Sequence, residues 1–114
     1  MQINGIHHIA IVCSDREKAL NFYHKGLGFS VIRDNCKENN KDHWKIDLDT
    51  GICELEIFIK QDWKELDPCA YGVRHLSFHV DDAEQCAREL KFRGIECDPV
   101  RTDQFTGEKI VICR

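Results

Sequence analysis

The hydrophobic and polar positions of the first half of the chain follow two periodicities, one typical of strands and one of helices. Apolar side chains occupy every second position of CELEIFIK, residues 53–60, which predicts a half-buried strand. Residues 29–33 and 44–48 also have strand-like patterns, whereas residues 14–29 repeat their apolar positions at helical spacing. With a further strand at the start of the chain, the first half is predicted to have the order βαβββ.

The beginning of this pattern occurs a second time. GIHHIAIVCSD (residues 5–15) is followed 67 positions later by GVRHLSFHVDD (residues 72–82). The repeat places His8 and His75 at equivalent positions, and an aspartate follows each of them after seven residues. A helical pattern follows each copy, so the two halves of the chain are predicted to be related modules.

Both predicted helices carry recognisable signals at their ends. Ser14 and Glu17 form a capping box at the start of the first helix, and Asp81 with Glu84 suggests the same arrangement for the second. Each helical pattern stops at a glycine, the residue best suited to a left-handed C-cap. The expected C-caps are Gly28 and Gly94.

The second half is predicted to have one strand fewer than the first. After a strand within residues 72–80 and the helix, residues 95–97 and 109–113 have strand patterns, and a Thr106-Gly107 turn precedes the last of them. We therefore expect an α+β fold in which paired βαβββ modules form a curved half-barrel sheet with helices outside, the second module being incomplete. The expected division is module one at 1–60, a linker at 61–71 and module two at 72–114.

Composition excludes several classes of function. The 114 residues carry a formal net charge of -4 with no stripe of Lys and Arg, so no nucleic-acid partner is expected. No apolar run approaches the roughly 20 residues that span a membrane, and the N-terminus does not resemble a signal peptide, which favours a cytoplasmic location. The seven cysteines are odd in number and contain no CxxC pair, a pattern typical of reduced thiols packed as small hydrophobes.

Two histidines and a carboxylate are the candidate functional residues. The repeat predicts that His8 and His75 converge near a pseudo-twofold axis, and strand alternation places Glu54 and Glu56 opposite the apolar face of their strand. Such a set commonly binds a divalent transition metal. The alternatives are that the histidines are structural and that the glutamates form a solvated strand face.

Taken in order, several segments resemble one family along essentially the whole chain. They are HHIAI with the aspartate that follows it, FY followed by LGF, WKIDL, GVRHLSF with VDD, and VRTDQFTGEK. Together they resemble the vicinal oxygen chelate superfamily, which includes glyoxalase I, and in particular its small bacterial glyoxalase-like metalloproteins. The resemblance implies the paired βαβββ fold and a divalent metal on the inner surface of the sheet.

The resemblance also implies ligands. His8, His75 and Glu56 match the family's metal-binding positions, with Glu54 as the fallback for the glutamate, and Glu56 is also the candidate catalytic residue. In the family a further glutamate, on a last strand, completes the site. The matching pattern stops at Arg114, before that strand, so we expect a shortened frame or a position filled by water or another chain.

The function implied is that of a metal-dependent, lactoylglutathione lyase-like carbon–sulfur lyase or isomerase. Its substrate would be a small α-hydroxy or α-keto compound or its thiol adduct, converted through a metal-stabilised enediolate. Nickel or zinc is favoured, with cobalt, manganese or iron as alternatives, and a homodimer is expected. The candidate contacts for an anionic substrate are Arg74, Arg101, Lys109 and Tyr71.

Three other functions remain open at this stage. One is a small-molecule binding module of the same fold that sequesters a drug and is metal-free or catalytically inactive. Ring-cleaving dioxygenases and epimerases belong to the same superfamily, and iron would favour the former.

Overall fold

The chain is organised in two units, Met1–Trp63 and Lys64–Arg114. The structure, a computed structural model, describes residues 1–37, 39–65, 67, 69–73 and 75–114. Each unit contains its own helix and its own strands. The fold is of the mixed α+β class, as the sequence predicts.

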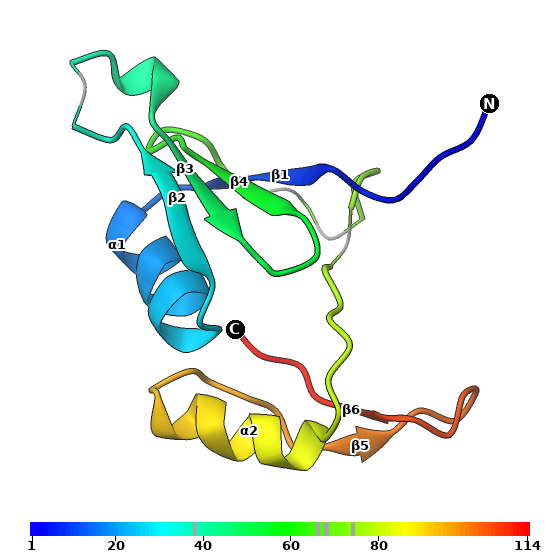
Figure 1. The fold of residues 1–114 in the computed structure, drawn as a ribbon. Helices are drawn as coiled ribbons and strands as arrows, with labels where there is room; N and C mark the ends of the chain where they lie inside the picture. The colour runs from blue at the N-terminus through cyan, green and yellow to red at the C-terminus, as the bar shows by residue number, and fades with distance from the viewer. Residues whose placement is uncertain (38, 66, 68, 74) are drawn as a thin grey trace. The chain divides into compact units, whose positions relative to one another are not determined.

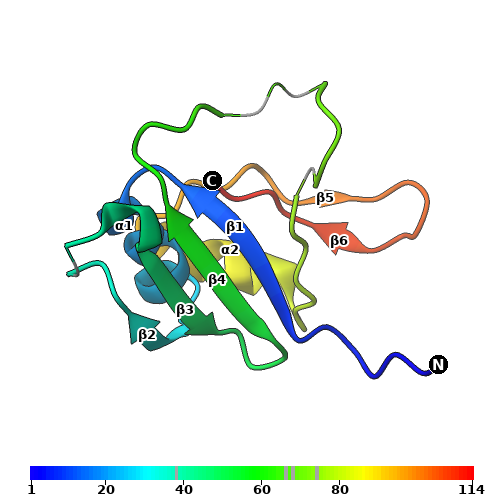
Figure 2. The same ribbon diagram turned by 90° about the horizontal axis from the view of Figure 1, so that it is seen from above.

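The first unit is built on a curved four-stranded sheet with the order β1-β4-β3-β2 (Figures 1 and 2). β1 runs parallel to β4, and the other neighbours are antiparallel. The strands are β1 (His8–Cys13), β2 (Ser30–Asp34), β3 (Lys45–Asp49) and β4 (Glu54–Ile59). All four lie within a few residues of the predicted segments, and a short 3-10 helix, η2 (Lys41–His43), precedes β3.

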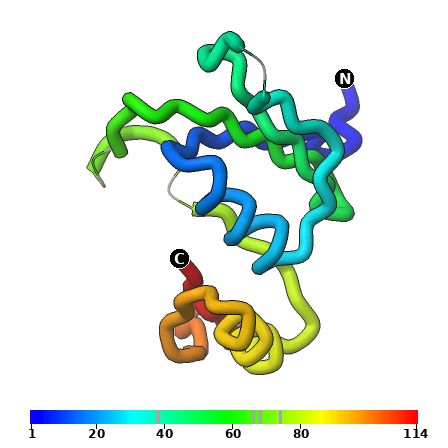
Figure 3. Tube along the Cα trace, turned by 90° about the vertical axis from the view of Figure 1, so that its left-hand side faces the viewer, coloured from blue at the N-terminus to red at the C-terminus, as the bar shows by residue number. Residues whose placement is uncertain are grey.

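One face of this sheet forms the core of the first unit. The alternation of β4 is observed as predicted, since every second side chain of Glu54–Ile59 is buried. Burial of a large aliphatic side chain contributes roughly 1.5–3 kcal/mol, so these positions hold the sheet against the helical segment that runs along it in Figure 3. The fully buried aliphatic residues, each 2% exposed or less, are Ile46, Leu48, Leu55, Ile57 and Ile59.

The helical segment of the first unit changes type along its length. It begins as the α-helix α1 (Arg16–Ala19) and continues as a π-helix, η1 (Leu20–Gly26). The wider turns show in the backbone, where the N–H of Leu27 donates to the carbonyl of Phe22. The sequence predicts a helix here, but its apolar spacing does not distinguish the two types. Gly28 has φ of 82° and ends the segment in the left-handed conformation, as expected.

The N-cap of α1 is Asp15, so the prediction of Ser14 is wrong by one residue. Asp15 has an extended backbone (φ -135°, ψ 116°), and its carboxylate accepts a hydrogen bond from the backbone N–H of Lys18. Both residue types favour the N-cap position, and the backbone conformation decides between them.

In the described part of the second unit the helix is α2 (Ala83–Phe92), and the same correction applies to it. Its N-cap is Asp82 rather than Asp81, with the Asp82 carboxylate accepting from the backbone N–H of Gln85. Gly94, with φ of 83°, lies in the left-handed region beyond the helix, as predicted.

The strands of the second unit are short. β5 (Arg101–Thr102) pairs antiparallel with β6 (Lys109–Ile110), and the connecting turn contains Gly107 with φ of 76°. β5 was not expected from the sequence pattern. The predicted strand at residues 95–97 is reduced to one antiparallel bridge, between Cys97 and Cys113.

The strand predicted within residues 72–80 is not formed at the described positions 72–73 and 75–80. Residues 75–80 have no strand assignment, and none of the described residues of the second unit pairs with them. The equivalent strand of the first unit, β1, pairs with β4 along its whole length. A strand is defined by its ladder of hydrogen bonds, so a segment with strand-forming residues but no paired neighbour is not a strand.

Two further observations concern the chain as far as the structure describes it. None of its helices is both long and apolar enough to cross a membrane. All seven cysteines are free thiols, in agreement with the absence of a pairing pattern in the sequence.

Candidate functional site

The polar face of the first unit's sheet gathers charged side chains from four strands. Glu54 and Glu56 of β4 point away from the buried face, because their neighbours Leu55 and Ile57 are buried. The strand register places His8 of β1 beside Glu54. It places Asp47 of β3 beside Glu56, so β1, β3 and β4 all have ionisable side chains on the same face of the sheet.

His8 and Glu56 lie next to each other on this face. The Nε2 atom of His8 is 3.6 Å from the Oε2 atom of Glu56, and their side chains are 46% and 19% exposed. The Nδ1 atom of His8 is 2.9 Å from Nδ1 of His7, so one of these nitrogens carries the shared proton. When His8 is the donor in that contact, its Nε2 is left with a lone pair directed at its surroundings.

Lys45 holds the other oxygen of Glu56. Its Nζ donates to Glu56 Oε1 over 3.1 Å and lies 3.3 Å from Oδ1 of Asp47. The hydrogen bond to Glu56 is the main reason that the pKa of Lys45 is raised. Glu56 is thus oriented with one oxygen on a cation and the other toward His8.

Asp47 is a buried carboxylate, with a side chain only 1% exposed. Its Oδ2 accepts a hydrogen bond of 2.7 Å from Nε of Arg33, which raises the pKa of the guanidinium. Among the residues that the structure describes, its Oδ1 finds no hydrogen-bond donor and relies on the nearby ammonium of Lys45. The same Arg33 donates to Oε2 of Glu54 over 3.1 Å.

Sequence reasoning missed Arg33, Lys45 and Asp47 as parts of this cluster. The sequence of β3 could have indicated two of them. Lys45 and Asp47 flank the buried Ile46, which is the same polar–apolar alternation that singled out Glu54 and Glu56 in β4. The pairing of Arg33 with Asp47 depends on the register between β2 and β3, which no local pattern reveals.

The cluster fits a divalent cation in its donor chemistry. An imidazole nitrogen and a carboxylate oxygen on one face are a common ligand pair for transition metals. The separation of 3.6 Å between His8 Nε2 and Glu56 Oε2 is shorter than two ligand bonds of roughly 2.0–2.2 Å placed end to end, so both atoms could contact one ion. Within the described ranges, no group of three or more His, Cys, Asp or Glu side chains is gathered closely enough to hold a metal. His8 and Glu56 therefore fit as two members of a ligand set.

The other predicted residues lie in the second unit. His75 lies in segment 75–80, which forms no strand, and its side chain is exposed. Arg74 lies outside the described residues. Tyr71 is fully exposed. Lys109 of β6 donates to Oε1 of Glu84 on α2 over 2.7 Å, so this ammonium links a strand to a helix.

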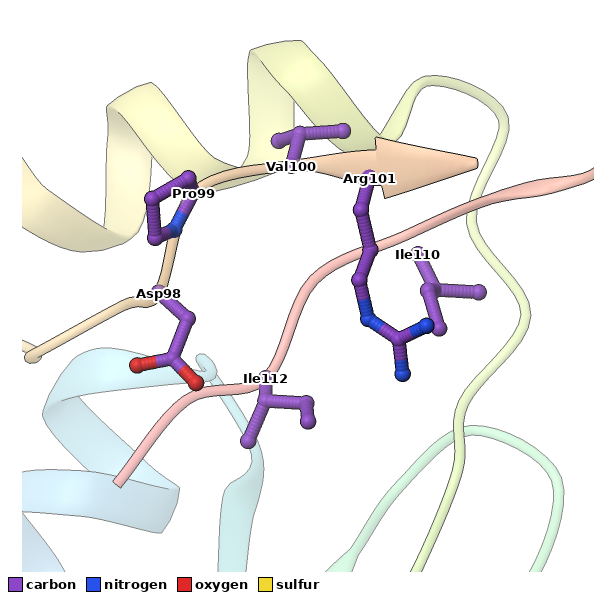
Figure 4. Close-up of a pocket in the computed structure, with 6 residues that line it drawn as sticks. All are labelled: Asp98, Pro99, Val100, Arg101, Ile110 and Ile112. Atoms are coloured by element: carbon purple, nitrogen blue, oxygen red, sulfur yellow. The ribbon is translucent and has the colours of Figure 1, made fainter. Parts of the chain in front are cut away.

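Arg101 lines a shallow pocket of about 340 Å³ in the second unit (Figure 4). Its wall is mostly aliphatic, with the Arg101 guanidinium and the Asp98 carboxylate as charged groups. Asp98 is held by two hydrogen bonds from Arg114, which lower the pKa of its carboxyl. The lining residues are Asp98, Pro99, Val100, Arg101, Ile110 and Ile112.

The fold and the polar face define a small α+β protein whose candidate chemistry lies on an open sheet surface. The model of the Glyoxalase/Bleomycin resistance protein/Dioxygenase superfamily matches residues 5–114. The chain belongs to this superfamily.

Relatives and solved structures agree with this assignment. The chain is 40% identical over 112 residues to the uncharacterized protein YwkD of Bacillus subtilis (strain 168), a match covering 96% of this chain and 87% of YwkD. The crystal structure of the glyoxalase family protein from Enterococcus faecalis is 39% identical with a TM-score of 0.85, covering 99% of this chain and 90% of that one.

More distant structures share the fold. One is an E126Q mutant of the fosfomycin resistance protein FosX from Listeria monocytogenes, in complex with Mn(II) and 1S,2S-dihydroxypropylphosphonic acid. It is 18% identical to this chain with a TM-score of 0.66, covering 88% of this chain and 75% of that one.

Proposed function

We propose that the chain is a divalent-metal-dependent, glyoxalase-like lyase or isomerase that acts on a small α-hydroxy or α-keto compound or its thiol adduct. The observation that carries the proposal is the 3.6 Å approach of His8 Nε2 to Glu56 Oε2 on the polar face of the sheet. Membership of the superfamily supports it, and His8 and Glu56 are two of the three ligands that the resemblance in the sequence implies.

Two side chains, His7 and Lys45, would prepare the ligand pair. His7 fixes the ring of His8 through the contact between their Nδ1 atoms, leaving Nε2 of His8 to bind the ion. Lys45 holds Oε1 of Glu56 and directs Oε2 toward the same point. When bound, the ion would act as a Lewis acid toward the substrate's neighbouring oxygens.

Glu56 would also move the proton. Because Lys45 bonds to Oε1, Oε2 would serve both roles in turn: when it is not on the ion, it would take a proton from one substrate carbon and return it to the next. The half-buried position of Glu56, 19% exposed, limits competition from water. The carboxylates of this face outnumber the cationic side chains Arg33 and Lys45, so a divalent cation would also balance local charge.

The remaining parts of the proposal rest on the sequence. His75 is proposed as the third ligand because the internal repeat equates it with His8. Arg74, Arg101 and Lys109 are proposed to contact an anionic substrate, with Lys109 the weakest of them because Glu84 already holds its ammonium. Nickel or zinc is the proposed metal, and the chain is proposed to act as a cytoplasmic homodimer.

The proposal is tested by turnover of a thiol adduct of a 2-oxoaldehyde in the presence of nickel or zinc. The expected result is metal-dependent isomerisation that Glu56→Gln abolishes. Glu54→Gln is the matched control on the same strand, because Glu54 is bonded to Arg33 rather than directed at His8, and it should retain most of the activity. Binding of such adducts without turnover and without metal would contradict the proposal and favour a drug-sequestering module instead.

A further inference from the structure

Two cysteines of the second unit lie in direct contact. The Sγ atoms of Cys97 and Cys113 are 3.0 Å apart, and the two residues face each other in an antiparallel bridge. Both side chains are partly buried, and they lie 16 positions apart in the sequence. Neither residue belongs to the polar face of the first unit.

The backbone around the pair has the geometry that accepts a disulfide. The N–H of Arg114 donates to the carbonyl of Glu96, and the N–H of Asp98 donates to the carbonyl of Ile112. These bonds flank Cys97 and Cys113, which therefore form a non-hydrogen-bonded pair. Such pairs have Cα atoms about 4.5 Å apart and the closest side chains of an antiparallel ladder, within the span of roughly 4.4–6.8 Å that a disulfide bridges.

We infer that Cys97 and Cys113 are a redox-active pair that closes into an intramolecular disulfide when the chain meets a low-molecular-weight disulfide. Two thiols in contact across a fixed bridge need no backbone rearrangement to react. The disulfide would fasten residues 112–114 to residues 96–98. Asp98 and Ile112, which Figure 4 shows at one end of the pocket, are the immediate neighbours of the pair and would be held in place by it.

The chemistry is two successive thiol–disulfide exchanges. The Cys97 thiolate attacks one sulfur of the small disulfide, whose S–S bond breaks, and the departing thiolate takes up the proton that Cys97 lost. Cys113 then attacks Sγ of Cys97, and the second small thiolate leaves with the proton of Cys113. The pair is oxidised by two electrons, and the small disulfide is reduced by two electrons to two thiols.

The same two exchanges apply whichever of the two thiols reacts first. Burial, and next the hydrogen bond with Cys97, raise the pKa of Cys113 to about 12, so Cys113 is protonated at neutral pH while the two thiols are in contact. Once Cys97 is in the mixed disulfide, the thiol of Cys113 lies next to Sγ of Cys97, the sulfur that it attacks.

The test uses the reduced full-length chain and oxidised glutathione, followed by alkylation with N-ethylmaleimide and intact-mass analysis. Each sample is unfolded before alkylation. The reduced chain should then take up seven alkyl groups, one for each cysteine, and the oxidised chain five, because two cysteines are lost to the disulfide. Trypsin separates the two residues into GIECDPVR (residues 94–101) and IVICR (residues 110–114). The expected product is these two peptides joined by a disulfide.

Three variants control the assignment. Cys97→Ser and Cys113→Ser should each remove the linked peptide and leave a glutathione adduct or a free thiol at the other position. Cys69→Ser changes an exposed cysteine elsewhere in the unit and should leave the link intact. In concentrated guanidinium chloride the selectivity for this pair should disappear. The inference is overturned if the folded chain gives only glutathione adducts, or if the main link joins another pair, such as Cys86 with Cys113.

Discussion

Arg33 Nε donates a 2.7 Å hydrogen bond to Oδ2 of Asp47, a carboxylate whose side chain is 1% exposed. Replacing Arg33 with leucine should therefore destabilise the chain, because a buried carboxylate that loses a hydrogen-bond partner carries a cost on the order of 1–3 kcal/mol. The double variant Arg33→Leu with Asp47→Leu should recover part of the loss, since it removes the charge as well as its partner. Urea unfolding of the three chains measures this, and a double variant less stable than Arg33→Leu alone would contradict it.

Asp34 should contribute stability that acid removes. Burial acts to raise the pKa of its carboxyl, but hydrogen bonds from Arg16 and from the backbone N–H of Cys36 outweigh it, and the net pKa is lowered. The contribution is therefore present above the unfolded-state pKa of about 3.9 and is lost as the pH falls through the lower folded-state pKa.

Asp34→Asn should consequently be less stable than the unmodified chain near neutral pH, and the difference should shrink at about pH 3. Unfolding in urea at both pH values measures it. Asp62→Asn, in an exposed turn, is the control and should show a smaller difference at neutral pH. A difference for Asp34→Asn that stays constant with pH would exclude this role for the carboxylate.

Asp82 should stabilise helix α2 as its N-cap. Asp82→Ala removes the acceptor for the backbone N–H of Gln85, 3.0 Å away, and is expected to cost about 1 kcal/mol. Asp81→Ala, one residue earlier, should have little effect. Thermal or urea unfolding measures the loss of stability in each variant. A larger loss for Asp81→Ala would contradict this assignment and favour Asp81 as the N-cap.

The thiol of Cys36 should be much less reactive than an ordinary cysteine. Cys36 is 7% exposed, and burial, followed by the hydrogen bond to Asp34, raises its pKa from 9.0 to about 11. At a given pH below these values its thiolate is about 100-fold rarer. Limited alkylation with iodoacetamide should label the exposed Cys69 well before Cys36 in the folded chain. Equal rates in the folded chain would contradict this account.

The strands of the first unit could be predicted because their cause is local. In β4 the alternation of buried and half-buried side chains is complete over Glu54–Ile59. The sequence of β3 alternates in the same way, although its polar residue Asp47 is buried along with Ile46 and Leu48. The N-caps could be predicted only to within one residue, since Ser14 and Asp15 are both good caps and the backbone angles choose between them.

The remaining features depend on distant pairings. The contact of Arg33 with Asp47 follows from the register of β2 and β3, and the contact of Cys97 with Cys113 follows from a single bridge. Residues 75–80 have the composition of a strand, but a strand also needs a neighbour, and that depends on the rest of the fold. The repeat predicted the equivalence of His8 and His75 but not the cluster that surrounds Glu56.

The central claim is that His8 and Glu56 hold a divalent ion, and calorimetric titration of the metal-free chain with nickel tests it most directly. His8→Ala and Glu56→Gln should each weaken binding by at least the roughly 10–100-fold typical of disturbing groups that support metal ligands. His43→Ala and Glu54→Gln, whose side chains lie outside the pair, should bind nearly as well as the unmodified chain. Unchanged affinity in His8→Ala and Glu56→Gln, or a loss confined to Glu54→Gln, would contradict the account.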